Sequence, residues 1–140
     1  MVSVKEVPAN KLVFKLKEEL KKVKELEPPA WAGVVKSGAH RERAPEQDDF
    51  WYIRLASILR RISIEEMVGV PRLRTYFGGR RRRGYKPARF RKAGGSMIRR
   101  ALQKLEAAGL VEKNAKRKGR KLTKAGQKLV NKMAYEVSKE

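Results

Sequence analysis

The sequence predicts a mainly α-helical domain around a central amphipathic helix, with a winged helix-turn-helix-like core and a small β-hairpin wing. Apolar residues recur at helical spacing in four segments, and two short strand-like segments precede the last of them. A chain of 140 residues with 41% hydrophobic residues fits one domain, residues 1–140. An ordinary helical bundle with a hairpin is the alternative interpretation.

Residues 1–48 are expected to be an N-terminal helix and loop that pack on the core. The helix is predicted over residues 8–26, where Leu12, Leu16 and Leu20 recur every four residues. The Pro28-Pro29 pair ends it, and residues 36–49 are predicted to be a loop. His40 lies in this loop without a partner for metal binding or catalysis, and we interpret it as a surface residue.

Residues 49–140 are expected to form the winged-helix-like core. Its central helix is predicted over residues 50–62, where one stripe contains Phe50, Trp51, Leu55, Ile58, Leu59 and Ile62. Arg54, Arg60 and Arg61 lie off that stripe. Ser63 followed by Glu66 predicts a capping box that opens a further short helix.

A basic loop is predicted over residues 78–95, because glycine pairs bound it and four consecutive arginines, Arg80 to Arg83, would repel one another in a packed element. The functional interpretation is a clamp on phosphates, with Tyr85 and Phe90 available to stack on unpaired bases. The alternatives are a solvated or nuclear-localisation-like run for the arginines, and packing against the core for the two aromatic residues.

The exposed helix of the winged core is predicted to start at Ser96 and to end at Gly109. Short strands at 110–113 and 120–122 then flank a basic tip with Lys116, Arg117 and Lys118. Thr123 is expected to cap the last helix, whose inward residues are predicted to be Ala125, Leu129, Val130, Met133, Ala134 and Val137.

Positive charge is concentrated in the middle and C-terminal parts of the chain. The net charge of +21 divides into +1 for residues 1–50, +13 for residues 51–100 and +7 for residues 101–140. Such an excess favours a polyanion as the partner, since neutralising phosphates releases bound counterions. The middle part contains mostly arginine, which binds phosphate bidentately and stacks on bases, so we expect the docking residues there.

Several function classes are disfavoured by the composition. The absence of cysteine excludes thiolate metal sites and cysteine nucleophiles. We expect no catalytic residue, cofactor or small-molecule substrate, because no carboxylate pair, Ser-His-Asp set or phosphate-binding glycine loop is present. No apolar run approaches the length of a membrane span, so no membrane partner is expected either.

These segments together resemble a known family, the small-subunit ribosomal proteins of archaea and eukaryotes numbered nineteen-e. The resemblance covers nearly the whole chain. It is most specific in the run Asp49 to Arg61, in Tyr76-Phe77-Gly78-Gly79-Arg80, and in Gly119-Arg120-Lys121-Leu122-Thr123. The abundance of Lys and Glu and the short termini look more like archaeal than eukaryotic members.

The resemblance implies a structural, non-enzymatic component of the small ribosomal subunit in the cytoplasm. Its partners would be ribosomal RNA and other small-subunit proteins, it would be a monomer outside the ribosome, and it would support subunit assembly and RNA maturation. The resemblance and the charge pattern together imply an RNA-binding surface made of Arg54, Arg60, Arg61, Arg80, Arg81, Arg82, Arg83, Tyr85, Lys86, Arg89, Arg91, Lys92, Arg99, Arg100, Lys116, Arg117 and Lys118.

Two rival functions remain open from the sequence. A winged-helix transcription regulator that binds DNA would explain the wing, although the arginine-rich insertion would crowd a recognition helix in the major groove. A peripheral membrane-surface protein would explain the charge, but the apolar helix faces are then needed both for lipid and for the core.

Overall fold

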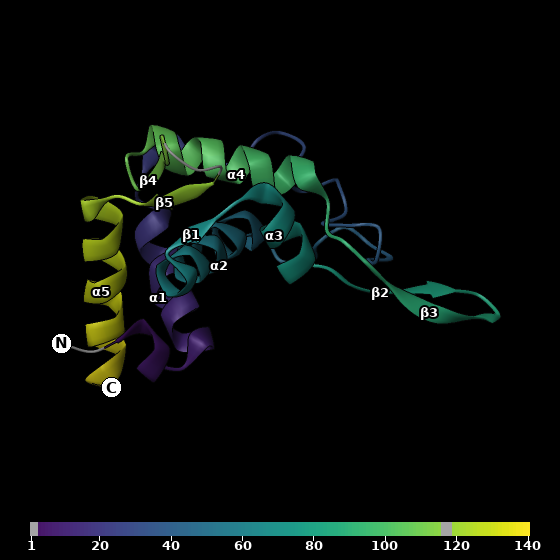
Figure 1. Cartoon of the computed structure of the whole chain (residues 1–140), viewed down its shortest axis with the longest axis horizontal. Helices are drawn as coiled ribbons and strands as arrows, with labels where there is room; N and C mark the ends of the chain where they lie inside the picture. Colours follow the sequence, from purple (N-terminus) through teal and green to yellow (C-terminus); the bar gives the residue numbers. More distant parts are fainter. Residues whose placement is uncertain (1–2, 116–118) are drawn as a thin grey trace.

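The computed structural model describes residues 3–115 and 119–140, and the described chain is mainly α-helical, as predicted (Figure 1). Its helices are α1 (Ala9–Leu20), α2 (Phe50–Glu65), α3 (Val70–Tyr76), α4 (Gly95–Ala107) and α5 (Lys124–Ser138), with short 3₁₀ turns η1 (Val4–Glu6) and η2 (Lys24–Leu26). Its strands are β1 (Met67–Val68), β2 (Gly79–Arg83), β3 (Lys86–Arg91), β4 (Val111–Lys113) and β5 (Arg120–Leu122).

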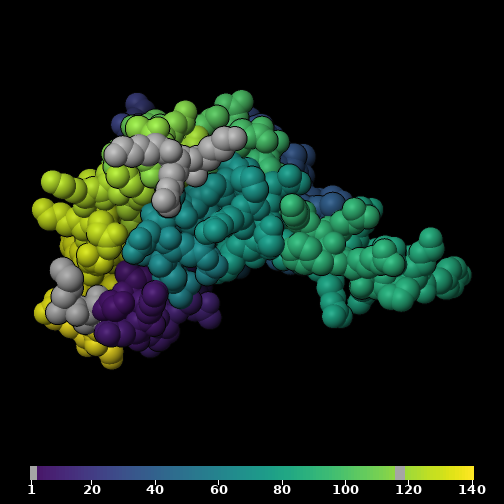
Figure 2. Space-filling model, viewed as in Figure 1, coloured from purple at the N-terminus to yellow at the C-terminus, as the bar shows by residue number. Residues whose placement is uncertain are grey.

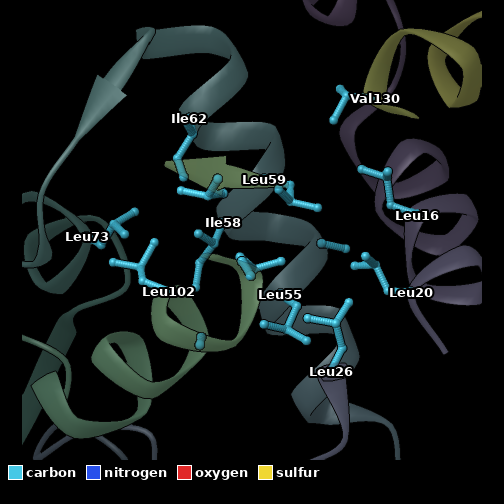
Figure 3. Close-up of a cluster of buried hydrophobic side chains, with 14 of the residues drawn as sticks. Leu16, Leu20, Leu26, Leu55, Ile58, Leu59, Ile62, Leu73, Leu102 and Val130 are labelled. Atoms are coloured by element: carbon cyan, nitrogen blue, oxygen red, sulfur yellow. The ribbon is translucent and has the colours of Figure 1, made fainter. Parts of the chain in front are cut away.

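Helix α2 is the centre of the core, as its apolar stripe predicted. Leu55, Ile58 and Ile62 are fully buried, and leucines from α1 and α4 pack around them (Figure 3). Trp51 is also buried, and its indole Nε1 donates a hydrogen bond of 3.0 Å to the carbonyl of Leu26. Trp31 meets Trp51 edge-on at 6.4 Å between ring centroids, so both tryptophans are part of the packing.

The N-terminal segment packs against α2 and α5, as expected, but its helix is shorter than predicted. Leu12, Leu16 and Leu20 are fully buried, whereas the helix ends at Leu20 and residues 24–26 form the separate turn η2. The buried Lys17 is held at this junction by Asp49, with 2.8 Å between Nζ and Oδ2. This ion pair joins α1 to the residue that precedes α2.

The predicted capping box at Ser63 is wrong, because α2 continues through Ser63 to Glu65. The pattern of serine and glutamate three residues apart also occurs inside helices, and here Ile62 and Ile64 keep the apolar face of α2 running past Ser63. Glu66 ends α2 with a φ of 67° and a ψ of −46°, which lies outside the helical region of the backbone map.

The two strands of the predicted small hairpin are present as the antiparallel pair β4 and β5, and they form part of a three-stranded sheet in the order β1-β5-β4. Strand β1 was not predicted, because two residues are too few for a recognisable pattern. Thr123 caps α5 as expected, with its Oγ1 accepting from the Gly126 amide at 3.2 Å. Ala125 is exposed rather than inward, and the buried position in this turn is Gly126.

The prediction of a basic loop at 78–95 is wrong in its secondary structure. Strands β2 and β3 pair antiparallel as a hairpin that projects from the helical body (Figure 1). Like charges did not prevent pairing, because most of the side chains on both strands are exposed to water, which screens their repulsion. The predicted glycine pairs flank the hairpin, and Gly84 forms its turn.

Candidate nucleic-acid interface

The β2–β3 hairpin is a narrow arm on the surface of the protein (Figure 2), and its strands are rich in arginine. Register places Arg81 opposite Arg89 and Gly79 opposite Arg91, while Arg80 lies opposite Phe90. Directly opposed like charges destabilise a strand pair unless a counter-charge lies nearby. No carboxylate among the described residues forms an ion pair with Arg81, Arg89 or Arg91, so this cation cluster is available to an external anion.

Alternation along the strands gives the hairpin two cationic faces. Arg81, Arg89 and Arg91 share one face, since opposed residues project to the same side and successive residues to opposite sides. Arg80 and Arg82 instead line a hollow toward residues 37–47. The hairpin can therefore contact phosphates on two sides.

The tip of the hairpin presents an aromatic ring to solvent. Gly84 has a φ of 70° in the turn, and the Nε of Arg83 donates a hydrogen bond of 2.9 Å to the carbonyl of Pro87 across it. Tyr85 next to Gly84 is fully exposed, and Lys86 beside it is exposed as well. A free ring among guanidinium groups is the arrangement that stacks on unpaired bases.

The base of the hairpin is held firmly by α3 and by the loop that precedes α2. The backbone amide of Ala93 donates to the carbonyl of Arg74, and the Arg74 Nε donates back to the carbonyl of Ala93, both at 2.9 Å. Gly38 pairs with Ala93 in a β-bridge, and the amide of Gly94 donates to the carbonyl of Ser37 at 2.9 Å. The direction of the arm is thus fixed by the body.

His40 fills the space between two glycines at this base. A Cβ added to Gly38 would lie 2.8 Å from the imidazole of His40, and one added to Gly79 would lie 3.0 Å from it. Burial, and then the charges of Arg41 and Arg54, lower the pKa of His40. The interpretation of His40 as a surface residue is therefore wrong, since its ring is a packing element of the hairpin base.

Arg54 is the candidate residue that differs most from expectation, because its side chain is buried and not part of an exposed surface. Its guanidinium lies between two rings, 5.0 Å from the centroid of Phe50 and 4.0 Å from that of Phe77. Burial, and then the charge of Arg41, lower its pKa to about 10. Phe77 adjoins the hairpin, so Arg54 joins the central helix to the base of the arm.

Arg60 and Arg61 are half-buried on α2. Arg61 is ion-paired with Glu65 and lies 4.3 Å over the ring of Tyr76. The Nε of Arg60 is buried and has no hydrogen-bond partner within the described part of the chain. These two arginines are less free to contact RNA than those on the hairpin.

A second group of exposed cations lies where the hairpin returns to α4. Lys92 follows β3, and Arg99 and Arg100 project from the first turns of α4, beside a hollow lined by Trp31. The cations predicted at the wing tip, Lys116, Arg117 and Lys118, lie outside the described residues.

Sequence reasoning missed two cations that the fold brings to the hairpin. Arg41 and Arg43 line the same hollow as Arg80 and Arg82, although they precede them by some forty residues. The only signal was their position beside His40, and nothing in the sequence indicated that this loop meets the hairpin base. Within the described ranges, no cluster of His, Asp or Glu can hold a metal ion, and no helix is long and apolar enough to cross a membrane.

Comparison with known proteins identifies the family. The sequence profile described as ribosomal protein S19e matches residues 3–140. The chain belongs to the ribosomal protein S19e family. This membership confirms the family that the resemblance indicated, and makes the protein a member of a structural, non-enzymatic family.

Individual S19e relatives align with nearly the whole chain. Small ribosomal subunit protein eS19 of Aeropyrum pernix is 46% identical over 142 residues, which cover 100% of this chain and 92% of the relative. Protein eS19G of Ascaris suum is 42% identical, covering 96% of this chain and 91% of the relative. Protein eS19A of Schizosaccharomyces pombe is 37% identical, covering 99% of this chain and 96% of the relative. The likeness therefore includes the hairpin as well as the core.

Proposed function

We propose that this protein is a structural constituent of the small ribosomal subunit that binds ribosomal RNA through the β2–β3 hairpin and adjoining cations. The observation that carries the proposal is the hairpin face with Arg81, Arg89 and Arg91, three cations without an acidic partner among the described residues. The names of the S19e relatives support a place in the small subunit. We infer the small subunit in the cytoplasm as its location.

The binding mechanism is electrostatic and geometric. Arginines 80 to 83 together with Lys86, Arg89, Arg91, Lys92, Arg99 and Arg100 neutralise phosphates where RNA strands converge, and each contact releases counterions. Arg60 and Arg61 extend this surface along α2. Lys116, Arg117 and Lys118 are proposed contacts on the strength of the sequence alone. Arg54 acts indirectly, through its stacking on Phe77 at the hairpin base.

Tyr85 supplies a contact of a different kind. Its fully exposed ring stacks on an unpaired base, while the cations beside it hold the backbone. The rigid mount at Ala93 supports this role, because a fixed arm loses little conformational entropy when it binds.

We infer that residues 1–140 form one domain with a winged-helix-like core. The order of α3, α4, the β4–β5 hairpin and α5, with β1 added to the hairpin as a third strand, supports this interpretation. The insertion of β2–β3 between α3 and α4 departs from the simple motif. It moves the main cationic surface from the helix face to the arm.

The remaining surface suits neighbouring proteins of the subunit. Residues 1–50 have a net charge of only +1, and α1 carries both signs on its exposed side. We propose that this near-neutral part contacts other small-subunit proteins and that the protein supports subunit assembly and RNA maturation. Outside the ribosome it is a monomer.

Fractionation of a cell lysate on sucrose gradients tests the proposal, with immunoblots at low and high salt. The expected result is stable co-migration with the small subunit at both salt concentrations. Absence from every ribosomal fraction would contradict the proposal and favour a winged-helix protein that binds DNA.

A further inference from the structure

The hairpin and the loop before α2 enclose a hollow of about 640 Å³ that the sequence did not predict. One wall carries Arg80 and Arg82 of β2, and the other carries Arg41 and Arg43 of the loop. We call this hollow the hairpin–loop slot. Figure 1 places the loop (blue) beside the base of the hairpin.

The two walls are held together by contacts at the hairpin base. The Gly38–Ala93 bridge and the hydrogen bond from Gly94 to Ser37 join the loop to the end of β3. His40 packs against Gly38 and Gly79, one residue on each wall. The slot is therefore formed before any ligand arrives, which lowers the entropic cost of binding.

The slot carries an excess of positive charge. Its four arginines outnumber its two carboxylates, Glu42 and Glu46. The carboxylates make only long, exposed ion pairs, 3.9 Å from Glu42 to Arg82 and 4.0 Å from Glu46 to Arg43. Such surface pairs contribute little and a better anion can replace them.

The buried neighbour Arg54 strengthens this field. It stacks on Phe50, which lines the slot, and no carboxylate of the described residues pairs with it. The charge of Arg41 lowers the pKa of both Arg54 and His40, although burial is the larger cause in each case. The Arg41 and Arg54 charges are therefore close enough to repel each other, and an anion bound near Arg41 would relieve that repulsion.

We propose that the hairpin–loop slot binds a phosphodiester segment of single-stranded RNA, with phosphates held between Arg41 and Arg43 on one wall and Arg80 and Arg82 on the other. The volume is that of a pocket for a small ligand and not of a groove for a duplex. A cationic groove that follows a single-stranded backbone is the usual arrangement for such RNA. This inference rests on the proposed function, and adds the loop to its RNA contacts.

The test compares the salt dependence of binding to small-subunit ribosomal RNA, measured by filter binding. The variant carries Arg41→Gln with Arg43→Gln, and its matched control carries Lys124→Gln with Lys128→Gln on the exposed side of α5. The slot variant is expected to flatten the slope of log K against log salt by roughly 1.4, about 0.7 per single-strand phosphate contact. The control is expected to keep the wild-type slope.

Two further variants sharpen the result. Arg41→Lys with Arg43→Lys keeps the charges and is expected to keep the slope, which separates charge from any effect on folding. Glu42→Gln removes the competing carboxylate and is expected to tighten binding by up to about five-fold, the upper limit for a surface ion pair.

A wild-type slope in the folded Arg41→Gln, Arg43→Gln variant would overturn the slot while leaving the proposed function intact. Failure of the wild-type protein to bind this RNA better than an unrelated RNA of equal length would overturn the proposed function and the slot with it. Equal flattening by the α5 control would overturn the slot alone.

Discussion

The guanidinium of Arg54 lies 4.0 Å from the centroid of the Phe77 ring, two residues before strand β2 begins. This contact joins the centre of the core to the base of the cationic arm. Phe77 in turn meets Tyr76 edge-on at 4.9 Å, and Arg61 lies over Tyr76. A ladder of stacked rings and guanidinium groups, in the order Arg54, Phe77, Tyr76 and Arg61, therefore extends along the face between α2 and α3, at the point where the hairpin leaves the body.

Phe77→Ala is expected to destabilise the protein by about 1–3 kcal/mol, because it removes a packed ring and leaves the buried Arg54 with one ring in place of two. Urea unfolding measures the change. Phe90→Ala is the control on the hairpin itself, where the ring is 53% exposed and the expected loss is below about 0.5 kcal/mol. Equal losses at both positions would contradict the ladder.

Asp49→Asn is expected to cost about 1–2 kcal/mol at pH 7, since it leaves the buried Lys17 without its closest carboxylate. Hydrogen bonding from Lys17 lowers the pKa of Asp49 below its ordinary value of 3.8. A lowered pKa stabilises the fold above that ordinary value, and this stabilisation is lost as the pH falls through the folded-state pKa.

Thermal melts from pH 7 to pH 2 therefore test the ion pair at Asp49. The wild type and Asp49→Asn are expected to differ at pH 7, and this difference is expected to shrink as the pH falls below 3.8 and through the folded-state pKa of Asp49. Asp48→Asn is the adjacent control, at an exposed position, and is expected to match the wild type throughout. A difference that does not shrink at any pH below 3.8 would attribute the loss to packing and not to charge.

Gly126→Ala is expected to destabilise the protein by about 1–3 kcal/mol even though alanine is the better helix former. The added Cβ would lie 2.2 Å from the carbonyl oxygen of Leu110, a backbone atom that cannot move away without shifting the β4–β5 hairpin. Lys128→Ala on the same helix is exposed and is expected to change the free energy of unfolding by less than about 0.5 kcal/mol. Chemical denaturation that ranks the two variants in the opposite order would refute this close contact.

Leu102→Asp is expected to abolish folding, because it places an unpaired charge in the centre of the core. Gln103→Asp, one position further along α4, faces solvent and is expected to fold. Circular dichroism distinguishes the two outcomes. A native spectrum for Leu102→Asp would mean that α4 does not pack against α2 as described.

Helical periodicity predicted the core correctly, because the stripe of Leu55, Ile58 and Ile62 must face inward wherever α2 lies. It failed at Ser63, where a capping pattern competed with a continuing apolar face. It also failed at 78–95, where most residues are exposed and no apolar alternation marks a strand. Pairing there depends on the glycine turn and on contacts at the base.

The candidate interface was only partly predictable for a related reason. The arginine run at 80–83 indicates a polyanion by composition alone. The sequence does not indicate that Arg54 is buried, since an arginine beside the apolar stripe is equally compatible with solvent exposure. Nor does it place Arg41 and Arg43 near the run, because the bridge between Gly38 and Ala93 joins segments that are distant along the chain.

RNA binding through the hairpin is tested by the salt dependence of ribosomal RNA binding by a hairpin variant. Replacing Arg80, Arg81, Arg82 and Arg83 with Gln is expected to flatten the slope of log K against log salt by about 3, with little change in melting temperature. The matched control replaces four exposed lysines of the C-terminal part with Gln, namely Lys124, Lys128, Lys132 and Lys139. This control is expected to leave the slope near its wild-type value. An unchanged slope in the hairpin variant would contradict the proposal that the β2–β3 hairpin binds RNA.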